Sequence, residues 1–181
     1  YQVYHSEIAW DEPTRKNIQK RIDRIVELST GRMLDIGCSD GVISILLGKV
    51  GKKVIGVDML QDHIDRANSK LAKTDNTTKR NVFFRQMWAE NLEYFDETYD
   101  TAILGEVLEH VVNTDIVLSE IKRVLKPDGL ALISVPIGEN AVRSHKRFFE
   151  KDTLTETLKP YFKVLDVQEF GAQMLAICRK G

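Results

Sequence analysis

The chain has 181 residues, of which 43% are hydrophobic, and its 26 basic and 27 acidic side chains give a formal net charge of −1. That length suffices for one domain with a sizeable core and is short for two. The balanced charge argues against strong non-specific binding to nucleic acid, and no apolar run approaches the ~20 residues that span a bilayer. Cys38 and Cys178 form neither a disulfide framework nor a zinc-binding spacing, which favours a reducing cytoplasm.

A first helix is predicted near the N-terminus. Asp11-Glu12-Pro13 is typical of a helix start, and apolar residues then recur at helical spacing until Thr30-Gly31. The interspersed basic side chains are expected to form a solvated face of this helix. They are Arg15, Lys16, Lys20, Arg21 and Arg24.

Beyond Gly31, predicted strands and helices alternate. Strands are expected at 32–36, 53–57, 81–86, 100–104 and 129–135, and helices at 41–49, 61–72, 113–125 and 152–158. Residues 73–79 are expected to form a polar loop, and 161–168 with 173–179 a C-terminal hairpin. This alternation indicates a parallel sheet with right-handed crossovers.

The segment 33–41 carries the clearest functional signal. An apolar run ends in Asp35 and is followed by a turn with Gly37 and Gly41, where missing Cβ atoms let a ligand approach the backbone. Asp58 ends the next strand, where a carboxylate suits the two hydroxyls of a ribose. The dinucleotide fingerprint G-x-G-x-x-G is not met, because the chain has Gly37-x-Ser39-x-Gly41, and Asp35 would repel a pyrophosphate. A ligand with a cationic amino group and a ribose, such as S-adenosylmethionine, suits the segment better.

Five short segments follow one another along the chain: DIGCSDG at 35–41, VDM at 57–59, FRQMWAENL at 84–92, YDTAILGEVLEHV at 99–111 and LKPDGLALISVP at 125–136. In order and spacing they resemble the motifs of the class I S-adenosylmethionine-dependent methyltransferases, with a likeness to the ubiquinone-biosynthesis O-methyltransferase subgroup. The resemblance implies an α/β, Rossmann-like, mostly parallel seven-stranded sheet with an antiparallel last strand and helices on both faces. It also implies a single domain over 1–181: an N-terminal helical segment over the site at 1–30, a cofactor-binding core at 31–136, and a substrate loop with C-terminal strands at 137–181.

The resemblance also implies which residues bind the cofactor. They are Asp35 and Gly37 near the methionine amino group, Cys38, Ser39 and Gly41 in the turn, Asp58 at the ribose, Met59, Trp88 and Ala89 at the adenine, and Gly105 and Glu106 beside the donor. Trp88 stands where relatives often carry an Asp. It is therefore expected either to stack on the adenine or to pack in the core.

The segment after the fourth strand holds the candidate catalytic groups. His110 and His145 are candidates for the general base that an oxygen acceptor requires. The string E-x-x-E-H, formed by Glu106, Glu109 and His110, resembles the metal site of ubiquinone-biosynthesis and small-RNA O-methyltransferases, with His145 as a further ligand. The same string also occurs in relatives without a metal, so a divalent ion is not expected. Arg143, Lys146 and Arg147 are expected to face water or an anionic group of the substrate.

The resulting functional prediction is an S-adenosylmethionine-dependent methyltransferase acting on a small-molecule acceptor at oxygen, with S-adenosylhomocysteine as product. No nucleic-acid partner and no membrane association are expected, and the sequence leaves the oligomeric state open. Three alternatives remain at this point. They are a metal-assisted RNA or catechol O-methyltransferase, a non-catalytic S-adenosylmethionine-binding module, and a dinucleotide-dependent oxidoreductase.

Overall fold

The structure is a computed structural model that describes residues 11–138 and 145–181. The predictions for the first ten residues and for Arg143 lie outside these ranges. The helices are α1 (Glu12–Leu28), α2 (Val42–Lys49), α3 (Gln61–Ala72), α4 (Asn76–Asn81), α5 (Thr114–Val124) and α6 (Lys151–Leu158). The strands are β1 (Met33–Ile36), β2 (Val54–Asp58), β3 (Val82–Gln86), β4 (Tyr99–Gly105), β5 (Leu125–Pro136), β6 (Lys163–Phe170) and β7 (Gln173–Arg179).

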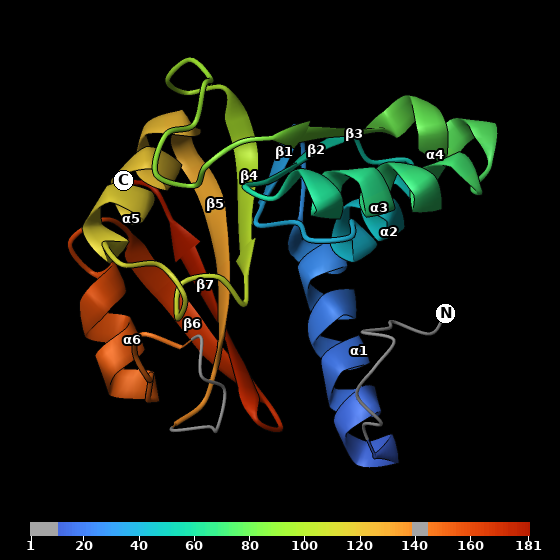
Figure 1. Cartoon of the computed structure of the whole chain (residues 1–181). Coiled ribbons are helices and arrows are strands. Elements are labelled where there is room, and N and C mark those ends of the chain that lie inside the picture. The colour runs from blue at the N-terminus through green and yellow to red at the C-terminus, as the bar shows by residue number, and fades with distance from the viewer. Residues whose placement is uncertain (1–10, 139–144) are drawn as a thin grey trace.

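The strands form one sheet in the order β3-β2-β1-β4-β5-β7-β6 (Figure 1). The five strands β1 to β5 run parallel, whereas β7 lies antiparallel to both β5 and β6. The predicted seven-stranded, Rossmann-like sheet with an antiparallel last strand is confirmed. Because parallel strands end at the same edge, the loops after β1, β2, β4 and β5 gather there. Open α/β sheets bind ligands at this carboxyl edge, which we call the ligand edge.

Helices cover both faces of the sheet, and alternating strand residues supply the two cores. In β4, Ile103 belongs to the core shared with Ile25 of α1 and Leu47 of α2. Its neighbours on β4 belong instead to the core that contains Leu118 of α5 and Leu154 of α6. This division follows from the period-two alternation of side chains along a strand. It also explains why the central strands read as continuous apolar runs.

Two elements differ from the sequence prediction by more than two residues. The expected loop 73–79 contains the start of α4, because the Asp75 side chain accepts hydrogen bonds from the backbone N–H groups of Thr77 (2.8 Å) and Thr78 (3.0 Å). An Asp with this pattern is an N-cap signal that the polar composition masked. Strand β5 begins at Leu125 rather than 129, because Leu125 already pairs with Tyr99 of β4 ahead of an irregular register.

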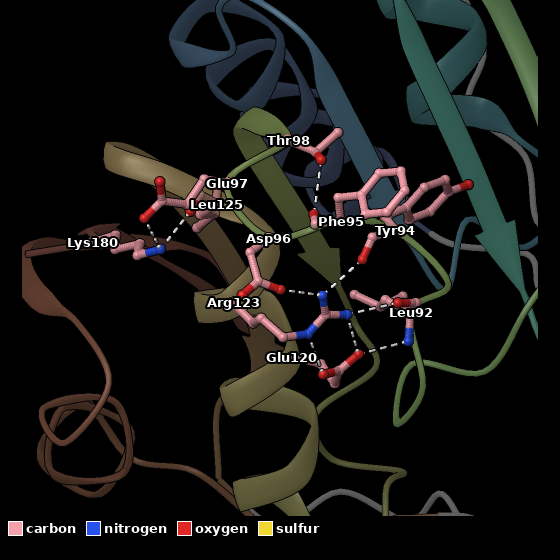
Figure 2. A network of polar contacts seen from close by, with 10 residues as sticks. All are labelled: Leu92, Tyr94, Phe95, Asp96, Glu97, Thr98, Glu120, Arg123, Leu125 and Lys180. Carbon is pink, nitrogen blue, oxygen red and sulfur yellow. Dashed lines mark hydrogen bonds and ion pairs between the residues drawn. The ribbon is translucent and has the colours of Figure 1, made fainter.

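The loop between β3 and β4 is tied to helix α5 by one guanidinium group (Figure 2). Arg123 donates to the carbonyl oxygens of Leu92 (2.7 Å) and Tyr94 (2.7 Å) and to Asp96 Oδ1 (2.8 Å). Glu120, one turn earlier on α5, accepts from Arg123 Nε (2.7 Å) and from the backbone N–H of Leu92 (2.8 Å). Arg123 therefore fixes the path of the chain as it leaves the ligand edge and enters β4.

We expect Arg123→Met to lower the free energy of unfolding by about 2 kcal/mol, because the carbonyl groups of Leu92 and Tyr94 lose their donors. Urea unfolding of the variant measures this loss. Lys159→Met is the matched control, since Lys159 and Glu156 form an exposed ion pair, which contributes about 0–1 kcal/mol. Equal losses in the two variants would contradict a structural role for the Arg123 contacts.

Candidate functional site

The turn after β1 is held in a left-handed conformation by its glycines. Gly37 has φ +69° and Gly41, which is the N-cap residue of α2, has φ +80°. Backbone hydrogen bonds fix the turn, from Cys38 N to Val57 O (2.9 Å) and from Gly41 N to Cys38 O (2.9 Å). The N-terminus of α2 thus carries no side-chain cap, and its N–H groups and positive dipole end are left for a ligand.

Neighbouring side chains give a further reason for the two glycines. A Cβ on Gly37 would lie 2.3 Å from Val107 Cγ2, and a Cβ on Gly41 would lie 2.4 Å from Phe84 Cζ. Both distances are far below contact, so the protein itself excludes side chains here. The expected close approach of a ligand is therefore not needed to explain either glycine.

Asp35 is buried inside the sheet rather than open to the ligand edge. It is 2% exposed, and its Oδ2 accepts a hydrogen bond from Ser44 Oγ of α2 at 2.6 Å. Burial raises the pKa of Asp35 from its ordinary 3.8 to about 6, against the opposing effect of the Ser44 hydrogen bonds. The predicted contact with a methionine amino group remains a prediction.

The raised pKa of Asp35 makes stability depend on pH. The folded state favours the protonated carboxyl, so this contribution is present below about pH 4 and is lost as the pH rises through about 6. We therefore expect the stability of Asp35→Asn relative to the wild type to rise by about 2 kcal/mol from pH 4 to pH 7. Urea unfolding of both proteins at the two pH values measures the gain, and a difference that does not change with pH would contradict it.

Asp58 ends β2 with its carboxylate held by three protein donors. Ser39 N donates to Oδ2 (2.9 Å), Leu60 N donates to Oδ1 (3.0 Å), and His63 Nδ1 lies 3.0 Å from Oδ1. The Asp58 side chain is 8% exposed and that of His63 27%. Asp58 is thus placed between the glycine turn and the first turn of α3.

Apolar side chains lie open beside Asp58. Met59 is 46% and Trp88 56% exposed, while Ala89 is half-buried. Two hydrogen bonds hold residues 86–87 against residues 58–59. Met87 N donates to Asp58 O (2.9 Å), and Gln86 Nε2 donates to Met59 O (3.0 Å). The reading of Trp88 as a core residue is wrong, because more than half of its surface is exposed. Its indole ring is available for stacking.

Glu106 follows β4 in a left-handed conformation with φ +56° and is held by three elements. Its Oε1 accepts from Ser134 Oγ of β5 (3.1 Å) and lies 3.4 Å from Arg21 Nη1 of α1, and its Oε2 accepts from Gln173 Nε2 of β7 (2.8 Å). Gly105, immediately before it, is half-buried. Glu106 is therefore the centre of a polar network that joins α1, β5 and β7 at the ligand edge.

The prediction that Arg21 lies on a solvated helix face is wrong. Arg21 is 5% exposed and donates from Nη1 to Ser134 Oγ. Its burial lowers the pKa of the guanidinium, while Glu106 and Glu109 oppose this shift. Long basic side chains usually keep their charge in water, but here the Glu106 carboxylate lies 3.4 Å from the buried guanidinium.

Glu109, His110 and His145 come together and leave Glu106 aside. One ligand atom from each of the three lies within 4.8 Å of the others, and the His110 and His145 rings meet edge to face at 4.7 Å. Glu106 is not in this group, and its Oε1 lies 3.4 Å from Arg21 Nη1. It is nevertheless near enough to raise the pKa of Glu109, and His145 joins Glu109 and His110 as the resemblance implied.

This group has the chemistry of a divalent-metal site. Glu109 is 1% exposed, and its Oε2 and His145 Nδ1 are buried without a hydrogen-bond partner. Burial, and then the nearby Glu106, raises the pKa of Glu109 to about 8. Carboxylate and imidazole groups suit several divalent ions, so Glu109, His110 and His145 are residues that could hold one.

Arg147 fixes His145 in this group. Its guanidinium donates to the carbonyl oxygens of Leu108 (3.0 Å), Val111 (2.7 Å) and Val112 (2.9 Å). Lys146 N adds a hydrogen bond to Glu109 O at 2.7 Å. The expectation that Arg147 faces water or an anionic substrate is wrong, because backbone carbonyls occupy its donors.

Sequence reasoning missed Ser44, His63, Gln173 and the burial of Arg21. Only Arg21 carried a usable signal: it lies three residues after Ile18 and four before Ile25, on the apolar stripe of its helix. The other three are polar residues whose role depends on partners from other elements. Nothing in the local sequence distinguishes them from solvated residues.

The geometry defines an α/β protein with a glycine turn, a buried carboxylate and a polar cluster at the carboxyl edge of its sheet. A family model described as "Methyltransferase domain" matches residues 10–161, and the chain belongs to this family. A curated relative, the ubiquinone biosynthesis O-methyltransferase of Rickettsia akari (strain Hartford), is 37% identical over 107 residues, which cover 59% of this chain and 41% of the relative. The chain thus matches less than half the length of that relative.

Solved structures share the fold at low sequence identity. A SAM-dependent methyltransferase from Aquifex aeolicus superimposes with a TM-score of 0.78 at 21% identity, covering 94% of this chain and 95% of the other. The [4+2]-cyclase SpnF superimposes with a TM-score of 0.80 at 18% identity, covering 99% and 85%. These likenesses show the fold alone, because one fold hosts different reactions. Within 11–138 and 145–181, none of the helices is long and apolar enough to cross a bilayer.

Proposed function

We propose that the chain binds S-adenosylmethionine and transfers its methyl group to an oxygen atom of a small-molecule acceptor, with release of S-adenosylhomocysteine. The observation that carries the proposal is one juxtaposition at the carboxyl edge of the sheet. The turn after β1 hydrogen-bonds Asp58 through Ser39 N. Gly37 of the same turn lies against Val107, in the segment after β4 that also carries Glu109 and His110. Membership of the methyltransferase family and the printed name of the Rickettsia relative support it.

The placement of the residues supports a cofactor role for each of them. Asp58 would accept the ribose hydroxyls, and the open side chains of Met59 and Trp88 would enclose the adenine. Asp35, Gly37, Cys38, Ser39 and Gly41 would border the methionine part, with Ala89 at the adenine edge and Gly105 and Glu106 beside the donor. Methyl transfer from a sulfonium is an in-line displacement, so the chain chiefly orients its reactants. Such orientation contributes up to ~7–11 kcal/mol.

The acceptor hydroxyl must also lose its proton. His110 or His145 would accept that proton as general base. A divalent ion held by Glu109, His110 and His145, when bound, would polarise the hydroxyl as a Lewis acid. The unpartnered Glu109 Oε2 and His145 Nδ1 suit such an ion, although none was expected from the sequence.

A labelled-methyl assay tests the proposal. The protein is incubated with S-adenosylmethionine labelled in its methyl group and with 3,4-dihydroxybenzoic acid, a soluble catechol, in the presence and absence of chelator. We expect label in a methyl ether. Loss of turnover with chelator and its recovery with Mg²⁺ would assign an ion, and unchanged turnover would assign a histidine base. Binding of S-adenosylmethionine without methyl transfer to the catechol or to other small phenols would contradict the proposed enzymatic activity.

The remaining assignments belong to the same proposal. The protein would act in the cytoplasm, and the described cysteines, Cys38 and Cys178, are both buried and free. Contact between Arg21 of α1 and Glu106 supports treating 1–30 as part of one domain with 31–136 and 137–181. The partner would be the small-molecule acceptor rather than a nucleic acid.

A further inference from the structure

The three donors on Asp58 fill most of its capacity. An ionised carboxylate has about four lone-pair positions. Leu60 N and His63 Nδ1 take both positions on Oδ1, and Ser39 N takes one on Oδ2. A ribose that binds through both hydroxyls brings two more donors. Five donors then compete for about four positions, so one of them must withdraw.

The two backbone donors are fixed by the fold. Ser39 N lies in the turn that is pinned by the hydrogen bonds of Cys38 and Gly41. Leu60 N precedes α3, where Leu60 O accepts from His63 N (3.0 Å) and Ile64 N (3.3 Å). Moving either group would break the turn or the start of the helix.

His63 is the donor that can leave. Its contact with Asp58 comes from a side chain with two rotatable bonds, and that side chain is 27% exposed. Rotation of this side chain needs no change in the backbone of α3. The ring would exchange one hydrogen bond to Asp58 for hydrogen bonds to water, and one lone-pair position on Oδ1 would become free.

We infer that His63 occupies the place of one ribose hydroxyl on Asp58 and withdraws when the nucleoside of the cofactor binds. The inference rests on the proposed function, which assigns the ribose to Asp58. His63 is in this view a specificity-determining residue that competes with the second hydroxyl. Because the competing contact must first break, it lowers the apparent affinity for ribonucleosides. A nucleoside with one ribose hydroxyl adds a single donor to the three protein donors. The total of four fits the carboxylate, so such a nucleoside does not compete with His63.

Calorimetric titration with two ligands and two variants tests the competition. His63→Phe keeps a flat ring but removes the donor, whereas His63→Gln retains a donor and is the matched control. The ligands are S-adenosylhomocysteine and its 2′-deoxy analogue. We expect His63→Phe to bind S-adenosylhomocysteine about fivefold more tightly than the wild type, in keeping with one hydrogen bond. We expect its affinity for the deoxy analogue to be unchanged and His63→Gln to resemble the wild type with both ligands.

The outcomes separate the inference from the proposed function. If the wild type binds neither ligand, the proposed function fails and the inference with it. If the wild type binds both ligands, and His63→Phe binds S-adenosylhomocysteine no more tightly than the wild type does, the inference alone is overturned. An equal gain for both ligands would also overturn it, because the competition acts only on the second hydroxyl. Binding of the deoxy analogue shows at the same time that the variant is folded.

Discussion

Replacing Arg21 with methionine is expected to lower the free energy of unfolding by about 3 kcal/mol, the cost of removing one partner from a buried ion pair. The Arg21 side chain is 6% exposed and that of Glu106 28%. Without the guanidinium, the Glu106 carboxylate loses its cationic partner. Urea unfolding of the variant measures the loss.

Two further variants decide whether charge is the cause. Arg15→Met, on the same helix, removes an exposed ion pair with Glu12 and should cost no more than about 1 kcal/mol. Adding Glu106→Gln to Arg21→Met should recover at least about 1 kcal/mol, because the unpaired carboxylate is then gone. A loss in Arg21→Met no larger than in Arg15→Met would contradict the account of this network.

Gly41→Ala is expected to lower the free energy of unfolding by about 2–4 kcal/mol, through left-handed backbone strain and overlap with a ring. The added Cβ would lie 2.4 Å from Phe84 Cζ at φ +80°. Because Gly41 begins α2 at the ligand edge, we also expect weaker binding of S-adenosylhomocysteine. Thermal or urea unfolding and calorimetry measure the two effects.

Gly51→Ala separates strain from overlap. Gly51 has nearly the same φ, +82°, but no atom lies within 4 Å of the Cβ position. Its substitution should cost about 1–2 kcal/mol from strain alone and leave ligand binding unchanged. Equal losses of stability at the two glycines, with intact binding in both variants, would contradict the role assigned to Gly41.

The fold was largely predictable because its signals are local. The alternation of apolar runs with helical periodicity predicted the parallel strands, and the acid-glycine segment 35–41 predicted the turn that begins α2. The hairpin of β6 and β7 was predicted from two apolar stretches around Gly171. The helix α4 was missed because a polar composition was given more weight than the capping pattern of Asp75.

The side-chain partners in the site were not predictable in the same way. Arg21 meets Ser134 across 113 positions of the chain, and Glu106 meets Gln173 across 67. Such contacts depend on how α1 and β7 pack on the sheet, which short motifs do not record. The string E-x-x-E-H likewise does not record that Glu106 pairs with Arg21 of α1, while Glu109 and His110 group with His145.

The binding of the cofactor at Asp58 is the central claim, and calorimetric titration of S-adenosylhomocysteine into wild type and Asp58→Asn tests it most directly. The account predicts micromolar binding to the wild type and a loss of about 1–3 kcal/mol in the variant, because the ribose hydroxyls lose their charged acceptor. Absence of binding to the wild type, or equal binding to both proteins, would contradict it.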